Sequence, residues 1–466
     1  MSSALDKGKN RVILVAKGDN QPVVRKGMDM KLGIASVDIT PSEPMLLRGY
    51  AARNRLSNGV EDPIEAGCML FDDGSSRVLL IAIDNLGVER NDMATLETAL
   101  RTVPGLESAE FFLGASHTHF APGFGSCLID EAGGPLPLGP FPADTAYLEF
   151  VRDRLLAAAR RALADLAPVR TERMTLPFPQ LGFNRRMIRR SDGMIQTNYM
   201  WPKDPENYRL QPWNDRMTLW RFVAESGTPR AILANFGCHA VTGGANFYGI
   251  SGDWPAAFRR AAAAALGVPL FFLQGTEGDV VPRRRNGSSR QDIAEIMART
   301  IRLHESDFAP TADLPLAYRR IMIPVEVRDP RRRGSAPAEY EAAVAAVDLS
   351  APETLRRIHQ AGEVAKVYRI FPEDRFELPL TMMRLGGDLL VGLPFEVLSP
   401  FSLRMREEVP EAVVCALVNG SEGYLPPEES FGRGGYESGY QAMTAPGTFE
   451  KFYRAAVAAA AGYRKE

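Results

Sequence analysis

The chain has 466 residues, of which 45% are hydrophobic and 24% are charged, the proportions of an ordinary globular protein. Its 55 basic and 57 acidic residues nearly cancel, which argues against nucleic acid as the main partner. No apolar run approaches the roughly 18 residues that a membrane span requires, so we expect no transmembrane segment.

The first 30 residues and the cysteines bear on processing and location. Residues 1–30 are predicted to form a flexible, polar N-terminal extension, because their short apolar run falls below the roughly 7–15 residues of a signal peptide. The four cysteines are far apart and form no CxxC pair. This pattern predicts a reduced, cytoplasmic protein.

The predicted elements begin with a strand over 32–40 that stops at Pro41. Strands at 67–71 and 77–84 form a hairpin, because Asp-Asp-Gly-Ser between them is a turn sequence. A helix over 91–102 then precedes a buried strand ending at Leu113.

Further helices and strands alternate through the rest of the chain. The Gly- and Pro-rich residues 123–142 predict a long loop. Helices are expected at 143–166, 255–265, 293–304, 337–347, 352–366, 399–407 and 448–464. Strands are expected at 172–178, 216–223, 230–237, 269–274, 315–327, 379–384, 388–393 and 412–418. Residues 420–447 are expected to be irregular. The order predicts one α/β catalytic domain over 31–466, with a large mixed β-sheet flanked by helices.

Imidazole and carboxylate side chains follow four of the predicted strands. They are His117 and His119, His239, Glu277 and Asp279, and Glu396. In open α/β sheets ligands bind beyond the carboxyl ends of the strands. We therefore expect these side chains to meet at one edge of the sheet.

The two neighbouring histidines indicate a metal site. His117 and His119 are two residues apart, a spacing that places both rings on one side of an extended backbone. Zn²⁺ binds imidazole nitrogen and carboxylate oxygen, and a catalytic site keeps one position open for water. The alternative for a single histidine is a structural hydrogen bond, which is our interpretation for His304 and His359.

Other polar residues allow two interpretations. One arginine of Arg185–Arg186 or Arg283–Arg285 would bind a substrate carboxylate or an oxyanion, or these residues form a solvated surface. Arg331–Arg333 are predicted to be solvated. Cys238 is either a thiolate ligand or, as we favour, a small buried residue. No G-x-S-x-G or Walker sequence supports a serine hydrolase or an NTPase.

A set of motifs in the order seen here resembles the neutral/alkaline ceramidase family. The matching stretches are Gly33–Thr40, Ser116–Gly123, Asn184–Arg185, Cys238–His239, Ser251–Asp253, Gln274–Val280, Leu393–Glu396 and Gly423–Glu429. The family's catalytic domain is a zinc-dependent amidase that splits the N-acyl bond of ceramide. The resemblance therefore implies the same fold and a hydrolase acting on carbon–nitrogen bonds.

The resemblance also assigns site residues. The implied Zn²⁺ ligands are His117, His239, Glu396 and Tyr424. The implied catalytic residues are His119 and Arg185, which line the reacting centre, and Tyr436, which hydrogen-bonds the developing oxyanion. Zn²⁺ is the implied cofactor, and a small-molecule amide is the implied partner.

Two departures from the family pattern bear on the substrate. Val281-Pro282 stands where the family has Ser-Pro, and we expect no immunoglobulin-like domain after the catalytic domain. Both favour an N-acyl or cyclic amide smaller than ceramide. The alternatives are a metal-dependent esterase or lactonase, and a non-catalytic ligand-binding homologue. The sequence does not indicate an oligomeric state.

Overall fold

A computed structural model describes residues 12–15, 23–26, 30–50, 53, 55–124, 142–286, 288–332, 334–345, 360–362, 373–439 and 441–464. Most of the predicted extension 1–30, the loop 123–142 and the helix 352–366 therefore lie outside the described residues. Within the first of these segments, β1 (Val12–Val15) and β2 (Val23–Lys26) pair as an antiparallel hairpin.

A large mixed sheet forms the centre of the structure. Its strand order is β14-β13-β12-β7-β3-β4-β5-β6, and β16 pairs with β7, which makes nine strands among the described residues. The strands are β3 (Lys31–Asp38), β4 (Glu65–Asp72), β5 (Arg77–Ile83), β6 (Glu110–Ala115), β7 (Ala167–Pro177), β12 (Arg216–Ala224), β13 (Pro229–Phe236), β14 (Leu270–Gln274) and β16 (Ala309–Pro310). The pairs β5–β6 and β13–β14 are parallel. The predicted mixed α/β fold is confirmed.

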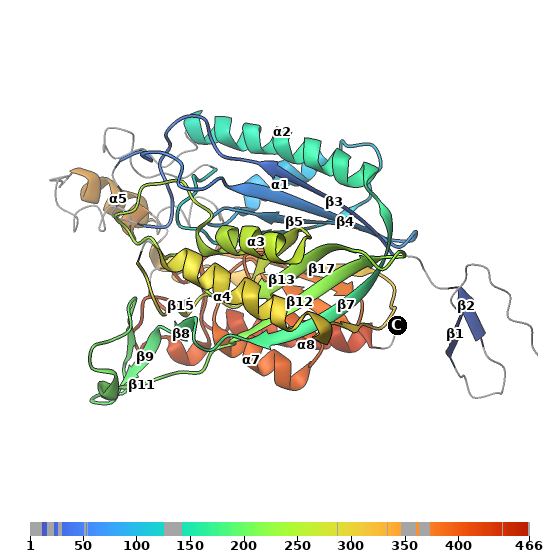
Figure 1. Ribbon diagram of the computed structural model, residues 1–466. Helices are drawn as coiled ribbons and strands as arrows, with labels where there is room; N and C mark the ends of the chain where they lie inside the picture. The colour runs from blue at the N-terminus through green and yellow to red at the C-terminus, as the bar shows by residue number, and fades with distance from the viewer. Residues whose placement is uncertain are drawn as a thin grey trace, which may run out of the picture.

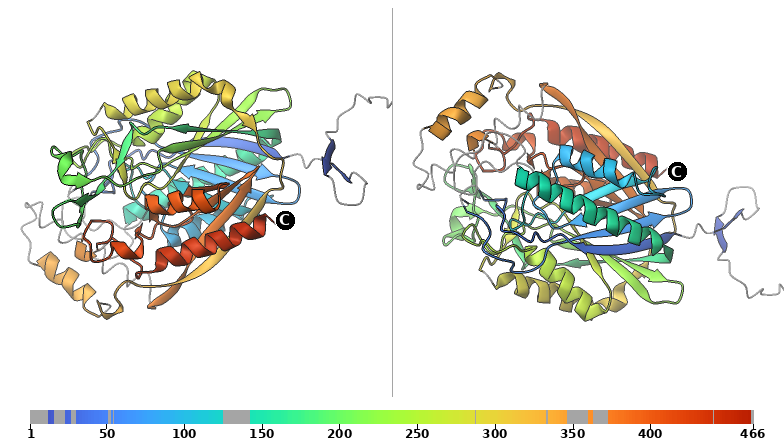
Figure 2. Two further views of the ribbon diagram at one scale, coloured as in Figure 1. Left: turned by 90° about the horizontal axis from the view of Figure 1, so that it is seen from below. Right: turned by 90° about the horizontal axis from the view of Figure 1, so that it is seen from above.

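A smaller sheet of four strands packs against the large one in the order β17-β18-β19-β21. Its strands are β17 (Ala317–Glu326), β18 (Arg375–Leu385), β19 (Asp388–Gly392) and β21 (Ala412–Cys415). The outer face of this sheet is covered by α7 (Ser399–Glu408) and α8 (Thr448–Tyr463). Figure 2 shows these two helices on the side opposite α2.

The remaining helices cover the large sheet. Helices α1 (Arg90–Leu100) and α2 (Pro142–Ala164) lie over β3–β6, and α3 (Asp253–Leu266) and α4 (Ser289–Leu303) lie over β12–β14 (Figure 1). Helix α5 (Ala336–Ala345) is at the edge of the molecule. No helix in the described part of the chain is long and apolar enough to cross a membrane.

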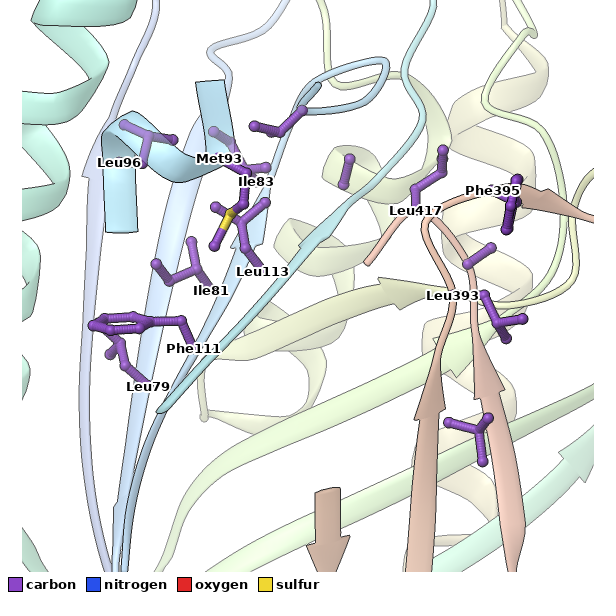
Figure 3. Packing of buried hydrophobic residues seen from close by; sticks show 14 of the residues in the cluster. Leu79, Ile81, Ile83, Met93, Leu96, Phe111, Leu113, Leu393, Phe395 and Leu417 are labelled. Carbon is purple, nitrogen blue, oxygen red and sulfur yellow. The ribbon is translucent and has the colours of Figure 1, made fainter. Parts of the chain in front are cut away.

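The period-two pattern of the strands explains the layering. In β5, Leu79 and Ile81 belong to the core under α1 and α2, whereas Val78 and Leu80 face the core between the two sheets. Figure 3 shows the first of these cores and its continuation towards Leu393 and Phe395. Both faces of the central strands are therefore buried, as their nearly continuous apolar sequences predict.

The carboxyl ends of four strands meet at one edge. A Cβ built on Gly114 of β6 would lie 2.6 Å from Leu273 Cδ2 of β14, so the two strands at opposite ends of the sheet order approach closely. Val418, after β21, forms a bridge with Gly114. Segments that follow β6, β13, β14 and β19 are thereby brought together, as the sequence predicted.

Candidate metal centre

The turn after β6 carries His117 and His119. His117 has a φ of +60°, so the backbone is left-handed at this residue and not extended. The sequence analysis predicted that the two rings are close because an extended backbone places them on one side, and this reason was wrong. The two rings are nevertheless close, since their Nε2 atoms lie 3.3 Å apart. A non-glycine residue in this conformation is strained, and such strain is concentrated at functional sites.

Hydrogen bonds hold the His117 turn against the segment that carries His239. The His119 amide donates to the Ala240 carbonyl at 3.2 Å, and the His239 amide donates to the Val280 carbonyl at 2.9 Å. The buried Gln274 side chain donates from Nε2 to the carbonyls of both Ser116 and Cys238, each at 2.9 Å. The sequence motif contained Gln274 but gave it no role, and the structure shows that its side chain joins the two histidine segments.

Glu396 and Tyr424 are adjacent because two very short strands pair. Strands β20 (Glu396–Val397) and β22 (Tyr424–Leu425) are parallel, with Glu396 opposite Tyr424. The segment 420–447, predicted to be irregular, therefore contributes a strand to the site. Glu396 Oε2 lies 3.3 Å from the Nε2 atoms of both His117 and His239.

The tautomers of the two histidines follow from their other ring nitrogens. His117 Nδ1 lies 2.7 Å from the Leu86 carbonyl, and His239 Nδ1 lies 2.7 Å from the Glu277 carbonyl. A carbonyl only accepts hydrogen bonds, so Nδ1 carries the hydrogen and each Nε2 presents a lone pair. Two lone pairs and a carboxylate oxygen thus converge, an arrangement that requires a proton or a cation between them.

The spacing of these atoms fits one metal ion. Ligand atoms about 2.0–2.1 Å from a tetrahedral ion lie about 3.3–3.4 Å from one another. The His117–Glu396 and His239–Glu396 separations are both 3.3 Å, and His239 Nε2 lies 3.4 Å from the Tyr424 hydroxyl. In the described part of the chain, the three histidines His117, His119 and His239 also group within metal-binding distance.

Electrostatics keep the site in the state that binds a cation. Burial, followed by the Arg185 charge, lowers the pKa of His239 to about 3, so its ring is neutral at pH 7. Burial acts to raise the pKa of Glu396, but the neighbouring His117 and His239 outweigh it and hold that pKa well below its ordinary value. The carboxyl group is therefore ionised.

Arg185 is a buried cation between the metal ligands and Glu437. Its Nη2 donates to the Tyr424 hydroxyl at 2.9 Å, and Nη1 lies 3.3 Å from His239 Nε2. Its Nε donates to Glu437 Oε1 at 2.7 Å. Glu437, which the sequence analysis missed, is fully buried and fixes the orientation of Arg185.

The structure also places His119 and Tyr436 at the site. The ring of His119 contacts Tyr50, with the ring centroids 5.0 Å apart. Tyr436 is half-buried, and its ring centroid lies 5.7 Å from that of Tyr424 and 6.0 Å from the Arg185 guanidinium carbon. All seven residues assigned by the resemblance therefore lie in one cluster.

Other candidates have structural contacts instead. Asp279 accepts hydrogen bonds from Ser399 and from Asn184 Nδ2, the latter at 2.8 Å. Cys238 is buried and belongs to no metal-binding group among the residues described. The Arg283 guanidinium stacks 4.0 Å from the centre of the Trp201 ring.

Comparison with solved structures shows the same fold. A neutral ceramidase from Pseudomonas aeruginosa superimposes with a TM-score of 0.72, at 17% sequence identity, over 94% of this chain and 75% of that chain. A ceramidase complexed with C2 gives a TM-score of 0.71 at 17% identity, over 94% and 76% of the two chains. No protein-family model and no curated protein matches the sequence. The resemblance read from the motifs is thus confirmed at the level of the fold.

Proposed function

We propose that this chain is a metal-dependent hydrolase that cleaves a carbon–nitrogen amide bond, that its metal is Zn²⁺, and that residues 31–466 are its catalytic domain. The observation that carries the proposal is the convergence of two Nε2 lone pairs and the Glu396 carboxylate at 3.3 Å. The ceramidase fold and the ordered motifs support an amide as the target bond.

The ligands would be His117, His239, Glu396 and Tyr424, which are the imidazole and oxygen donors that Zn²⁺ accepts. A bound Zn²⁺ lowers the pKa of a water molecule to about 7 and so supplies a nucleophile at neutral pH. The Leu86 and Glu277 carbonyls fix the rings of the two ligand histidines. Loss of such a partner typically weakens metal binding about 10–100-fold.

His119 is the proposed proton acceptor. Burial, followed by the proximity of His117 and His239, which disfavours a further positive charge, holds the pKa of His119 well below its ordinary value, so the ring is neutral at pH 7. Its Nε2 lies 3.3 Å from His117 Nε2, next to the position where water would react. A neutral imidazole in this position can accept the proton that the attacking water loses.

Arg185 and Tyr436 are the proposed donors to the oxyanion. Attack of water on an amide carbonyl makes a tetrahedral intermediate whose oxygen carries negative charge. The guanidinium of Arg185 cannot lose its charge, and Glu437 prevents it from changing orientation. A preoriented donor in a buried site stabilises this charge more than it stabilises the ground-state carbonyl.

The apolar surroundings of Val281 support a small substrate. Val281 is fully buried in a cluster with Phe183, Met187 and Val241, beside the segments that carry Arg185 and His239. The family's hydroxyl at this position is therefore replaced by packed hydrocarbon. We propose an N-acyl or cyclic amide without the long chains of ceramide.

The experiment compares metal-free and Zn²⁺-loaded protein on N-acyl amino acids, cyclic amides, matched esters and a short-chain ceramide. Hydrolysis of at least one amide should disappear on chelation and return with Zn²⁺. Amide turnover that persists without metal would contradict the proposal. Turnover of esters alone would favour the esterase or lactonase alternative, and binding without turnover would favour the ligand-binding alternative.

A further inference from the structure

Glu277 is a buried carboxylate that the proposed mechanism does not use. It follows β14, and its backbone carbonyl accepts the hydrogen bond from His239 Nδ1 at 2.7 Å. Its side chain groups with His117 and Glu396, and the potential ligand atoms of these three residues all lie within 4.8 Å of one another. The turn thus contributes both a backbone and a side-chain group to the centre.

The carboxylate of Glu277 is fully buried, yet neither of its oxygens has a hydrogen-bond partner on another described residue. Elsewhere in the protein, the buried carboxylates Glu172 and Glu437 are each paired with two arginines. Leaving a buried carboxylate unpaired is strongly unfavourable, and such groups usually pair or bind a metal ion. Burial, and next the charge of Glu396, raises the pKa of Glu277 well above its ordinary value in the protein without an ion.

We propose that Glu277 provides a second carboxylate ligand to the metal centre, beside Glu396. This inference rests on the proposed function, because it requires the ion that His117, His239 and Glu396 would hold. Two ligand atoms about 2.0–2.2 Å from one ion are at most about 4.4 Å apart. The potential ligand atoms of Glu277, His117 and Glu396 lie within 4.8 Å of one another, so the Glu277 carboxylate lies beside the position that the ion would occupy.

The local backbone supports this role. A Cβ on Gly278 would lie 2.7 Å from the Glu396 carbonyl oxygen, so only glycine allows the turn to approach this closely. The Gly278 amide donates to the Val397 carbonyl at 3.0 Å. The chain therefore holds the Glu277 turn directly against the segment that carries the first carboxylate.

A second carboxylate changes which ions the centre prefers. Two carboxylates together carry the charge that neutralises a divalent cation. They also add oxygen ligands to a centre whose other ligands include imidazole nitrogens. Oxygen-rich sites suit Mn²⁺, whereas Zn²⁺ is satisfied by three protein ligands of mixed type. Removing Glu277 should therefore weaken Mn²⁺ binding more than Zn²⁺ binding.

The test measures dissociation constants for Zn²⁺ and Mn²⁺ by chelator competition in wild-type protein, Glu277→Gln and Glu277→Leu. Both variants should bind Zn²⁺ at least about 10-fold more weakly, the loss that even indirect partners of a metal produce. Denaturant unfolding of the metal-free proteins provides a second measurement. Neither variant should be less stable than wild type there, because each removes a buried carboxyl group that has no hydrogen-bond partner among the described residues.

Glu172→Gln is the matched control, since Glu172 is a buried glutamate paired with Arg170 and Arg221 away from the site. It should lose stability and keep its metal affinity. If wild type binds metal and both Glu277 variants bind it equally well, the second-ligand role is wrong and the proposed metal centre stands. Variants that do not fold without metal would also contradict the role. A wild-type protein that binds no metal would overturn the proposed function itself.

Discussion

Replacing Glu437 with glutamine tests whether this buried carboxylate stabilises Arg185, the proposed oxyanion donor, in its buried position. Glu437 accepts hydrogen bonds from Arg185 Nε at 2.7 Å, Arg186 Nη1 at 3.2 Å and Thr197 Oγ1 at 2.8 Å. Glutamine keeps the shape but removes the charge that both buried arginines face. Removing one partner of a buried ion pair costs about 3–5 kcal/mol, so the free energy of unfolding should fall by about that amount.

The pH dependence of this loss has a definite sign. Burial acts to raise the pKa of Glu437, but the charges of Arg185 and Arg186 outweigh it, and the pKa is lowered. The pKa of a glutamate in the unfolded chain is about 4.3. A lower pKa in the folded protein stabilises the folded state at any pH above that unfolded-state pKa, and this stabilisation is lost as the pH falls through the folded-state pKa. The difference in the free energy of unfolding between wild type and Glu437→Gln should therefore be largest at pH 7 and should decrease below about pH 4.3.

The assay is denaturant unfolding of the metal-free proteins between about pH 3 and pH 7. Glu295→Gln is the control, because Glu295 forms an exposed pair with Arg299 on α4 and should lose only about 0–1 kcal/mol. A Glu437→Gln loss as small as that of the control, or one that does not change with pH, would refute the reasoning.

Three further predictions concern the site and its substrate. Tyr436→Phe should keep its metal while kcat falls about 10²–10³-fold, whereas Tyr424→Phe should bind metal more weakly; metal analysis and single-turnover rates of both variants separate the two roles. Gly49→Ala should lower activity more than it lowers metal content, because a Cβ at this residue, with φ +102°, would lie 2.4 Å from His119 Nδ1. Wild-type kinetics with Gly49→Ala would show that His119 has freedom to move. Long-chain ceramide should be turned over more slowly than the best small amide, in view of the packed Val281, and comparable rates in a direct competition assay would contradict this.

Much of the fold could be predicted because the local sequence determines it. In β5 both faces meet a core, so a continuous apolar run bounded by turn residues locates the strand. The convergence of strand ends was also predictable, since parallel strands carry their following segments to one edge. The proximity of His117 and His119 was predicted for the wrong reason, because the left-handed φ of His117 has no local sequence signal.

The parts that could not be predicted depend on contacts between distant segments. Glu437 meets Arg185 across 252 positions of sequence, so nothing near either residue indicates the pair. The pairing of Glu396 with Tyr424 uses strands of two residues, which are too short for a periodic pattern. Tyr424 was identified only through resemblance to a family, and its hydroxyl lies 3.4 Å from His239 Nε2.

The metal content of the purified protein tests the central claim most directly. Wild-type protein should hold about one Zn²⁺ per chain, and His239→Ala should lose most of it, since removing one ligand leaves an incomplete, hydrated site. His304→Ala is the control, because this half-exposed histidine pairs with Asp307 away from the site and should keep full occupancy. Full Zn²⁺ occupancy in His239→Ala, or no bound metal in wild type after loading, would contradict the account.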